Sequence, residues 1–286
     1  MCLIAFAVGA RPGLPLLLAA NRDEFFDRPT APWHRWAMPG GGEVLGGRDL
    51  RDGGTWLGVS VDARVAMLTN VRGAQAASGV RSRGELATRW LAGERLETLR
   101  TDIAPQSYGG FNLVVGDLRT GAWHWLSNCD PRRPKEGVVS QLTSRSLAPG
   151  VYGLSNAALD TPWPKTLRLK AAVTKALPTA TNASPLSGWE SGLVHALADE
   201  TLAPADQLPA TGVGLARELG LSSPFVRLPE HGYGTRSSLV LRIAATERAQ
   251  RWQLDAHEWT HTPQAPYRSH HWDDTRRRTE SLLLGS

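Results

Sequence analysis

The sequence contains few cysteines and no long apolar run, and each shortage excludes a class of protein. Two cysteines among 286 residues, Cys2 and Cys129, cannot build a disulfide framework, so we expect a reduced, cytoplasmic setting. The apolar stretch at residues 3–10 is too short to span a bilayer, and no basic segment precedes it. We therefore expect a soluble protein that is neither exported nor stably inserted in a membrane.

Concentrated positive charge and phosphate-binding loops are also missing. The net charge of +5 is spread along the chain apart from Arg276–Arg278, which argues against nucleic acid as a partner. The 29 glycines form neither a Gly-x-x-x-x-Gly-Lys-Ser/Thr frame nor a Gly-x-Gly-x-x-Gly turn between strand and helix, which argues against nucleotide binding. With 41% hydrophobic residues and no repeat or linker, residues 1–286 are expected to form a single domain.

Short apolar runs punctuated by turn residues dominate the chain and predict antiparallel sheets. Capping-box patterns begin expected helices at Ser82 and Ser187, and a third helix is expected over residues 164–177. The Pro/Gly-rich residues 29–54 are interpreted as a long functional loop. Grouped strands, grouped helices and closing strands indicate the α+β class. The expected hairpins cover residues 3–8 with 16–21, 55–61 with 65–70, 111–118 with 122–126, and 137–156, and the closing strands cover 234–243 and 251–257.

Cys2 directly follows Met1, so removal of Met1 would place a thiol and a free α-amine on one residue. An α-amine titrates near pH ~8 and a thiol near ~8.5, so the pair can act together as base and nucleophile. The other interpretation is that Cys2 is a small hydrophobic residue opening a buried strand.

The polar run Asn21-Arg-Asp-Glu24 ends the second expected strand. If the first two strands pair, this run lies near Cys2, where Arg22 would favour a thiolate and Asp23 would orient an amine. A charged strand end in solvent is the alternative.

Seven short motifs follow one another along nearly the whole chain. They are Met1-Cys-Leu-Ile4, Ala20-Asn-Arg-Asp-Glu-Phe25, Gly53-Gly-Thr-Trp-Leu-Gly58, Leu68-Thr-Asn70, Gly110-Phe-Asn-Leu113, Gly153-Leu-Ser-Asn156 and Gly234-Thr-Arg-Ser-Ser238. Together they resemble the NRDE family, also called the Transport and Golgi organization family. This resemblance implies an N-terminal nucleophile hydrolase-like fold, a four-layer αββα sandwich of two antiparallel sheets.

The resemblance implies chemistry similar to that of acylases, in which an N-terminal cysteine attacks an amide carbonyl. By this similarity Cys2 would be the nucleophile of a hydrolase that cleaves a linear C–N amide bond of a small acyl substrate, with its own amine as base. Arg22 and Asp23 would steady that pair. The remaining carried-over positions are Asn70 and Asn156 as oxyanion donors and Arg236 as a cation near the thiolate.

One departure from the acylase pattern concerns Arg22 and Asp23, which are adjacent where those enzymes separate the two residue types. Neighbours on a strand point to opposite faces, so both face Cys2 only with a bulge or turn. Without such a bulge or turn, only one of Arg22 and Asp23 faces Cys2, and Glu24 is the candidate to take the place of the other.

Members of the same family are linked to haem handling, so the resemblance also implies an alternative, a carrier of haem or another hydrophobic metabolite. No cofactor is required for the hydrolase interpretation, and haem would then be a ligand. Aromatic planes and arginines suit a porphyrin and its propionates. The candidates are Trp33, Trp36 and Trp56 for the plane, Arg22, Arg48 and Arg72 for the propionates, and Cys2, His34 or His231 as axial ligands.

A remote alternative is a zinc hydrolase, because His257-Glu258-Trp-Thr-His261 matches the His-Glu-x-x-His signature. That signature needs a helix to bring both histidines to one ion, whereas alternating Trp252, Leu254 and Ala256 predict a strand. We therefore expect no metal site here.

Overall fold

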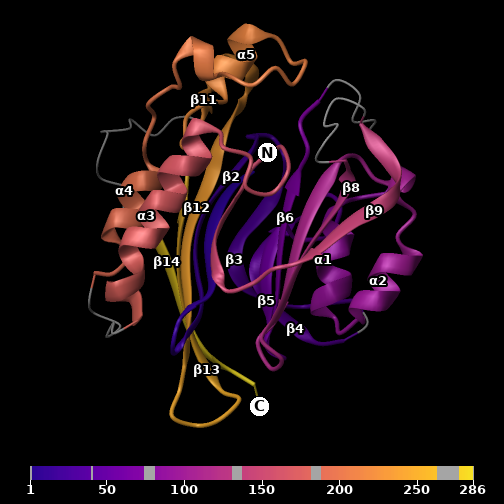
Figure 1. Cartoon of the computed structure of the whole chain (residues 1–286), viewed down its shortest axis with the longest axis vertical. Helices are drawn as coiled ribbons and strands as arrows, with labels where there is room; N and C mark the ends of the chain where they lie inside the picture. The colour runs from indigo at the N-terminus through magenta and orange to yellow at the C-terminus, as the bar shows by residue number, and fades with distance from the viewer. Residues whose placement is uncertain are drawn as a thin grey trace.

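The computed structural model describes residues 2–39, 41–73, 81–130, 137–181, 188–262 and 277–285 (Figure 1). Its strands form two antiparallel sheets. The first has the order β10-β1-β2-β12-β13-β14, with β11 paired to β12, and the second has the order β3-β4-β5-β6-β7-β8-β9. The first sheet comprises β1 (Cys2–Arg11), β2 (Leu14–Phe25), β10 (Gly150–Leu154), β11 (Arg227–Leu228), β12 (Tyr233–Ala245), β13 (Trp252–Thr260) and β14 (Arg277–Leu284). The second comprises β3 (Thr30–Ala37), β4 (Glu43–Asp49), β5 (Leu57–Ser60), β6 (Arg64–Asn70), β7 (Phe111–Asp117), β8 (Ala122–Cys129) and β9 (Val138–Ser146).

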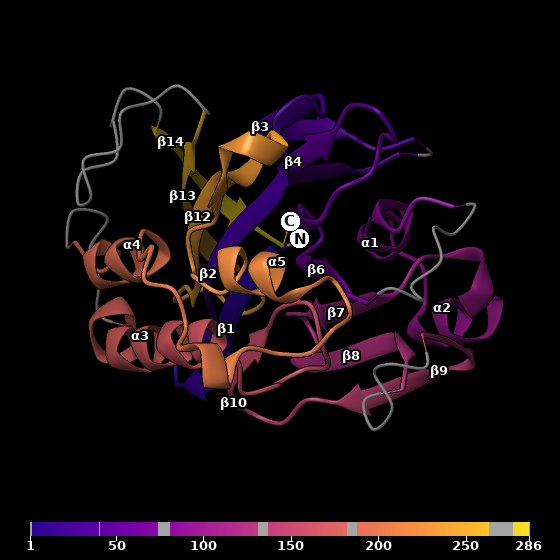
Figure 2. The ribbon, with the colours of Figure 1, turned by 90° about the horizontal axis from the view of Figure 1, so that it is seen from above.

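Helices cover the outer faces of both sheets, giving the four layers that the resemblance implied (Figure 1). Helices α3 (Pro164–Thr181) and α4 (Ser191–Leu197) lie on the first sheet, and α1 (Gly84–Leu91) and α2 (Leu96–Asp102) lie on the second. Helix α5 (Leu215–Gly220) lies at the end of the sandwich where β1 begins (Figures 1 and 2). The expectation of an α+β sandwich of two antiparallel sheets is confirmed.

Alternating side chains explain why β1 sits between two apolar layers. Ile4 and Phe6 belong to the core between the sheets, whereas Leu3 and Ala5 pack toward α3 and α4. Successive side chains of a strand point to opposite faces, so a strand buried on both faces is apolar throughout. A third apolar cluster, which includes Trp90, joins the second sheet to α1 and α2.

Three of the expected hairpins are confirmed, formed by β1 with β2, β5 with β6, and β7 with β8. The expected hairpin over residues 137–156 is wrong. Its two strands, β9 and β10, belong to different sheets, so this segment carries the chain from the second sheet to the first. β9 pairs with β8, the strand directly before it, whereas β10 pairs with β1, which is far away in the sequence.

The interpretation of residues 29–54 as a loop is also wrong, because they contain β3 and β4. The glycines there permit close strand contact. A Cβ added at Gly46 would lie 2.7 Å from the carbonyl oxygen of Leu57 on β5. A bulkier residue would push the strands apart, so glycine here marks a crowded sheet.

The expected helices form, but without the expected caps. No side chain caps α1, and Glu85 instead accepts the Tyr108 hydroxyl and pairs with Arg81 at 2.6 Å. At α4 the predicted cap Ser187 lies outside the described residues, and Glu190 pairs with Arg277 of β14 at 3.2 Å. The carboxylate of Glu85 is thus engaged by Arg81 and Tyr108, and that of Glu190 by Arg277. The sequence did not predict α2, α5 or β14. Among the described helices, none is long and apolar enough to cross a membrane.

Candidate active site

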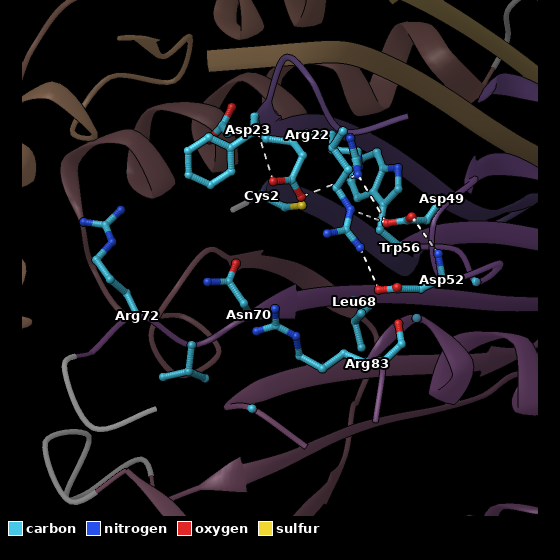
Figure 3. Close-up of a pocket in the computed structure, with 18 of the residues that line it drawn as sticks. Cys2, Arg22, Asp23, Asp49, Asp52, Trp56, Leu68, Asn70, Arg72 and Arg83 are labelled. Atoms are coloured by element: carbon cyan, nitrogen blue, oxygen red, sulfur yellow. Dashed lines mark hydrogen bonds and ion pairs between the residues drawn. The ribbon is translucent and has the colours of Figure 1, made fainter. Parts of the chain in front are cut away.

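A cavity of about 830 Å³ opens at the end of the sandwich where β1 begins and β2 ends (Figure 3). Its size is within the range of small-molecule sites. Charged side chains dominate its lining. They are Arg22, Asp23, Glu24, Arg28, Asp49, Arg51, Asp52, Arg72, Arg81, Arg83 and Arg217, beside Cys2, Trp56, Leu68, Asn70 and Tyr233.

Cys2 lies in this cavity at the start of β1, directly opposite Arg22 in the ladder with β2. Its backbone carbonyl accepts the Ser155 hydroxyl at 3.1 Å. Burial raises the pKa of the Cys2 thiol to about 11, against the opposing effect of the Arg22 charge. At neutral pH the thiol is therefore protonated and needs a base before it can act as a nucleophile.

Arg22, Asp23 and Glu24 all line the cavity, so adjacency in sequence does not remove any of them from the site. The β2–β12 ladder pairs Asp23 with Thr235 and Arg22 with Ser237, which leaves an extra residue, Arg236, on β12. This bulge lies on the partner strand β12, so it does not by itself turn Arg22 and Asp23 of β2 to the same face. The Arg22 charge lowers the pKa of the Cys2 thiol, whereas the charges of Asp23 and Glu24 raise it.

Asp23 is almost completely buried and accepts the Thr235 hydroxyl at 2.7 Å. Burial raises the pKa of its carboxyl, while the nearby Lys165 lowers it. Lys165 is buried in turn, donates to the Leu221 carbonyl at 2.8 Å, and has its pKa lowered by burial to about 8. No motif singled out Lys165. Its position depends on α3 packing against the first sheet.

Asn70 and Asn156 have different places, which corrects their prediction as equivalent donors. Asn70 ends β6 and lines the cavity, across from Cys2 in Figure 3. Asn156 is fully buried and does not line it. Its Nδ2 donates to Oδ1 of Asn70 at 3.0 Å, which leaves Nδ2 of Asn70 as that side chain's donor group. Asn156 thus orients Asn70 and links the two sheets.

Two other predicted cations lie outside the cavity lining. Arg236 donates through Nη1 to the backbone carbonyls of Phe25, Phe26 and Arg28, so it fixes the turn after β2. Arg48 donates to the Gly53 carbonyl at 3.3 Å and stacks over Trp36. The structure therefore does not bring Arg236 or Arg48 into the cavity lining, and their roles beside the thiol and at a ligand stay predictions. In both cases backbone carbonyls, which no sequence pattern displays, accept the guanidinium bonds.

Trp56 and Arg72 do line the cavity as predicted for a ligand site. Arg72 is buried beside Glu218 of α5, with Nη1 2.7 Å from Oε2, and the pKa of its guanidinium is lowered by burial. The other haem candidates lie elsewhere. Trp33 and Trp36 are in core clusters, and His34 and His231 do not line the cavity.

Several lining residues had no signal in the sequence. Arg28 bonds both Asp49 and Asp52 at 2.7 Å, and Arg83 at the start of α1 donates to the Gly110 carbonyl at 3.3 Å. The start of α1 reaches the cavity because Gly54 packs on Gly84, where an added Cβ would lie 2.6 Å from the Gly84 carbonyl carbon. In the sequence, only the Gly53-Gly54 pair indicated that another segment packs closely at this position.

The His257–His261 segment is a strand, as predicted, and its residues do not converge. Glu258 accepts the Trp33 backbone amide at 2.6 Å, while Nδ1 of His257 contacts Thr279 and Nε2 of His261 contacts Ser238. In the part of the chain that the structure describes, no cluster of histidine, cysteine, aspartate or glutamate could hold a metal ion.

Residues 1–254 match the family model of Transport and Golgi organisation 2. The chain belongs to this family. Its relatives include the Transport and Golgi organization protein 2 homologs of Bos taurus, 33% identical over 285 residues, and Homo sapiens, 32% identical over 286 residues. Both alignments cover 91% of this chain and 99% of the relative. The Drosophila melanogaster protein is 28% identical, over 92% of this chain and 96% of its own.

Two solved structures are also similar to this family member. A Caenorhabditis elegans ortholog of N-acylethanolamine-hydrolyzing acid amidase superposes with a TM-score of 0.42 and 11% identity, covering 84% of this chain and 92% of its own. A mutant conjugated bile acid hydrolase from Clostridium perfringens has a TM-score of 0.40 and 11% identity, covering 88% and 91%.

The motifs by which the sequence resembled the Transport and Golgi organisation family gather around the cavity. Cys2, residues 22–24, Gly54 and Asn70 line it. Asn156 supports Asn70 from behind, and Thr235 supports Asp23. The motifs thus mark both the wall and its supports, without distinguishing one from the other.

Proposed function

We propose that this protein is an N-terminal-cysteine hydrolase that cleaves a linear C–N amide bond of a small acyl substrate. The observation that carries the proposal is the position of Cys2, which lines an arginine-rich cavity across from the amide of Asn70. The Asn156 bond to Oδ1 of Asn70 supports a donor role for Nδ2.

The steps would begin after removal of Met1. The α-amine of Cys2 takes the thiol proton, and the sulfur attacks the carbonyl carbon to form a C–S bond. Nδ2 of Asn70 donates to the developing oxyanion. The C–N bond then breaks and the amine leaves with the proton held by the α-amine. Water, deprotonated by the same amine, attacks the thioester and releases the acid and the Cys2 thiol.

The burial of Cys2 supports the need for a base on the same residue. Burial raises the pKa of the thiol, and a protonated thiol is a weak nucleophile at neutral pH. The free α-amine, which titrates near pH ~8, supplies that base.

The test begins with the intact mass of protein purified from its native cell. Met1 retained on all of the protein would contradict the proposal, because the free amine would then lie on the wrong residue. With Met1 absent, Cys2→Ala is compared with Cys129→Ala on a panel of acyl amides. Cys129 is equally buried and does not line the cavity. We expect turnover to be abolished by Cys2→Ala and retained by Cys129→Ala. Unchanged turnover in Cys2→Ala would exclude the mechanism.

The second candidate is binding of haem or another hydrophobic metabolite in the same cavity, without catalysis. Trp56 and Arg72 in the lining support it. The residues fit the propionates better than the iron. Of the predicted axial ligands only Cys2 lines the cavity, and its raised pKa disfavours the thiolate that binds metal. Haem titration of wild type and Cys2→Ala tests this. A saturable Soret shift that Cys2→Ala alters supports it, and no saturable binding at micromolar haem contradicts it.

A further inference from the structure

The cavity contains more arginine than its own carboxylates can neutralise. Seven arginines line it, against the four lining carboxylates Asp23, Glu24, Asp49 and Asp52. Two of the seven pair with acids outside the lining, since Arg72 pairs with Glu218 and Arg81 with Glu85. Among the described residues, Arg51, Arg83 and Arg217 are the lining arginines without an ion pair.

Exposure separates Arg83 from the other two. Arg51 and Arg217 are exposed, so water solvates their charges. Arg83 is half-buried, and the single hydrogen bond of its guanidinium within the described chain is the 3.3 Å contact to the Gly110 carbonyl. Burial lowers the pKa of its guanidinium, while the Cys2 and Glu24 charges oppose that shift. A partly desolvated cation without a counter-ion gains most from a ligand anion.

Arg83 also lies where it could meet a ligand held at Cys2. Figure 3 shows it on the wall that contains Asn70, across the cavity from Cys2. It is the N-cap residue of α1, whose first turn has no side-chain cap, and Ser82 and Gly84 line the cavity beside it. The positive end of the helix dipole adds to the guanidinium charge.

A second observation at the same cavity points to an anion. Arg22 is 5% exposed, and its Nη1 is buried with no hydrogen-bond partner in the described chain. Its two ion pairs are long, 3.6 Å to Glu24 and 3.9 Å to Asp49. The wall around Cys2 thus contains guanidinium groups that the protein itself leaves incompletely satisfied.

We propose that Arg83 binds an oxyanion of the substrate, a carboxylate or a phosphate, at a subsite across the cavity from Cys2. This names a substrate class for the proposed function and rests on it, and the substrate is then the amide of an acid with a second, free anionic group. Arg83 is a specificity residue, which contacts a part of the substrate other than the reacting bond.

The test needs no knowledge of the substrate. Alkylation rates of Cys2 are measured with anionic and neutral electrophiles of matched shape, iodoacetate against iodoacetamide and bromoacetylglycine against bromoacetylglycinamide. In each reaction the Cys2 sulfur displaces the halide. The thiolate fraction cancels from the rate ratio, so changes in the pKa of Cys2 do not affect it. N-acetylcysteine supplies the reference ratio.

We expect an anionic-to-neutral ratio above the reference for wild type, and about tenfold lower for Arg83→Gln with at least one reagent pair. Arg83→Lys should retain part of the preference. Arg95→Gln is the matched control, because it removes the same charge from an exposed residue outside the cavity. A ratio that Arg83→Gln leaves unchanged for both pairs would overturn the proposal. If Arg83→Gln fails to fold, Arg83→Met, which also removes the charge, replaces it with the same expected and contradicting results.

Protection by small anions then identifies the group. Glutarate and inorganic phosphate are compared as inhibitors of Cys2 alkylation by iodoacetamide, and the effective one indicates a carboxylate or a phosphate. Protection by neither, or protection that persists in Arg83→Gln, would contradict the subsite. None of these measurements requires hydrolysis. If the subsite exists but the protein is not a hydrolase, Cys2 alkylation will still prefer the anionic reagents while no amide is turned over.

Discussion

Two buried arginine–carboxylate pairs, one in the cavity wall and one on the outer face of the first sheet, have almost the same geometry. Arg72 and Glu218 are separated by 2.7 Å with side chains 3% exposed, and Arg242 and Asp255 by 2.8 Å with side chains 4% and 7% exposed. Distance and burial therefore do not distinguish a pair at a candidate site from a pair within the scaffold.

The difference lies in the remaining polar atoms. Both carboxylates accept further hydrogen bonds, Asp255 from Ser281 and Gln253 and Glu218 from Thr211. The guanidinium groups differ, because Arg242 also donates to the Ala180 carbonyl, whereas Nε and Nη2 of Arg72 are buried without a partner in the described chain. Unsatisfied buried groups cost stability, so Arg72 keeps hydrogen-bonding capacity at a cost that Arg242 avoids.

The largest effects are expected from breaking these pairs. Glu218→Ala and Asp255→Ala should each lower the free energy of unfolding by about 3–5 kcal/mol, because each leaves a buried arginine uncompensated. Replacing both members of each pair by apolar residues should lower the free energy of unfolding by different amounts in the cavity wall and on the outer face. Arg72→Met with Glu218→Leu should cost less, by about 1–3 kcal/mol, than Arg242→Met with Asp255→Leu, because Arg242→Met strands the Ala180 carbonyl whereas Arg72→Met removes two unsatisfied buried N–H groups. Urea denaturation measures both.

An exposed pair provides the control for that series. Arg35 and Glu43 are about half exposed, and Arg35→Ala should cost less than about 1 kcal/mol. Equal costs for the two double replacements would contradict the distinction between cavity and scaffold.

The second prediction separates activity from stability. With an amide substrate from the panel, Asn70→Ala should lower kcat by about 10²–10³, the loss typical of an oxyanion donor, with little change in stability. Asn156→Leu should lower kcat through misorientation of Asn70. Asn128 is the matched control, because it is fully buried, accepts the Phe111 amide and does not itself line the cavity. Asn128→Ala should lower stability and spare kcat. The reverse pattern would remove Asn70 from the mechanism.

Asn70 and Asn156 also show how far the sequence could lead. The family resemblance implied their place at the site and the four layers, whereas local patterns predicted most of the strands. Which of the two faces the cavity depends on a hydrogen bond between different sheets, 86 positions apart in the chain. The positions of Arg236 and Arg48 depend on bonds to backbone carbonyls, which no side-chain pattern displays. Arg83 and Lys165 had no motif, because helix packing alone brings them to the site.

The third prediction concerns Glu258, a buried carboxyl of β13. Burial raises its pKa from an ordinary 4.5 to about 7. Between these values the folded protein holds a proton that the unfolded chain has lost, so stability is fully present below pH 4.5 and falls as pH rises to about 7. The loss is on the order of 3 kcal/mol. Denaturation across this range should show a negative slope that Glu258→Gln flattens. A slope unchanged in the variant would assign the effect to another group.

The smallest expected effect belongs to His257, the neighbour of Glu258 in sequence, and it has the opposite sign. Burial and the Arg277 charge lower the pKa of the imidazole below 6.5, and Nη2 of Arg277 lies 2.9 Å from Nδ1. The folded protein therefore excludes a proton that the unfolded chain binds, so its contribution is full above pH 6.5 and falls on acidification. Because the Glu258 slope overlaps this window, His257→Gln is measured in the Glu258→Gln background. There the remaining positive slope should disappear while kcat stays unchanged, since His257 lies outside the cavity lining. A loss of turnover would instead make β13 part of the site and break the division between cavity wall and scaffold.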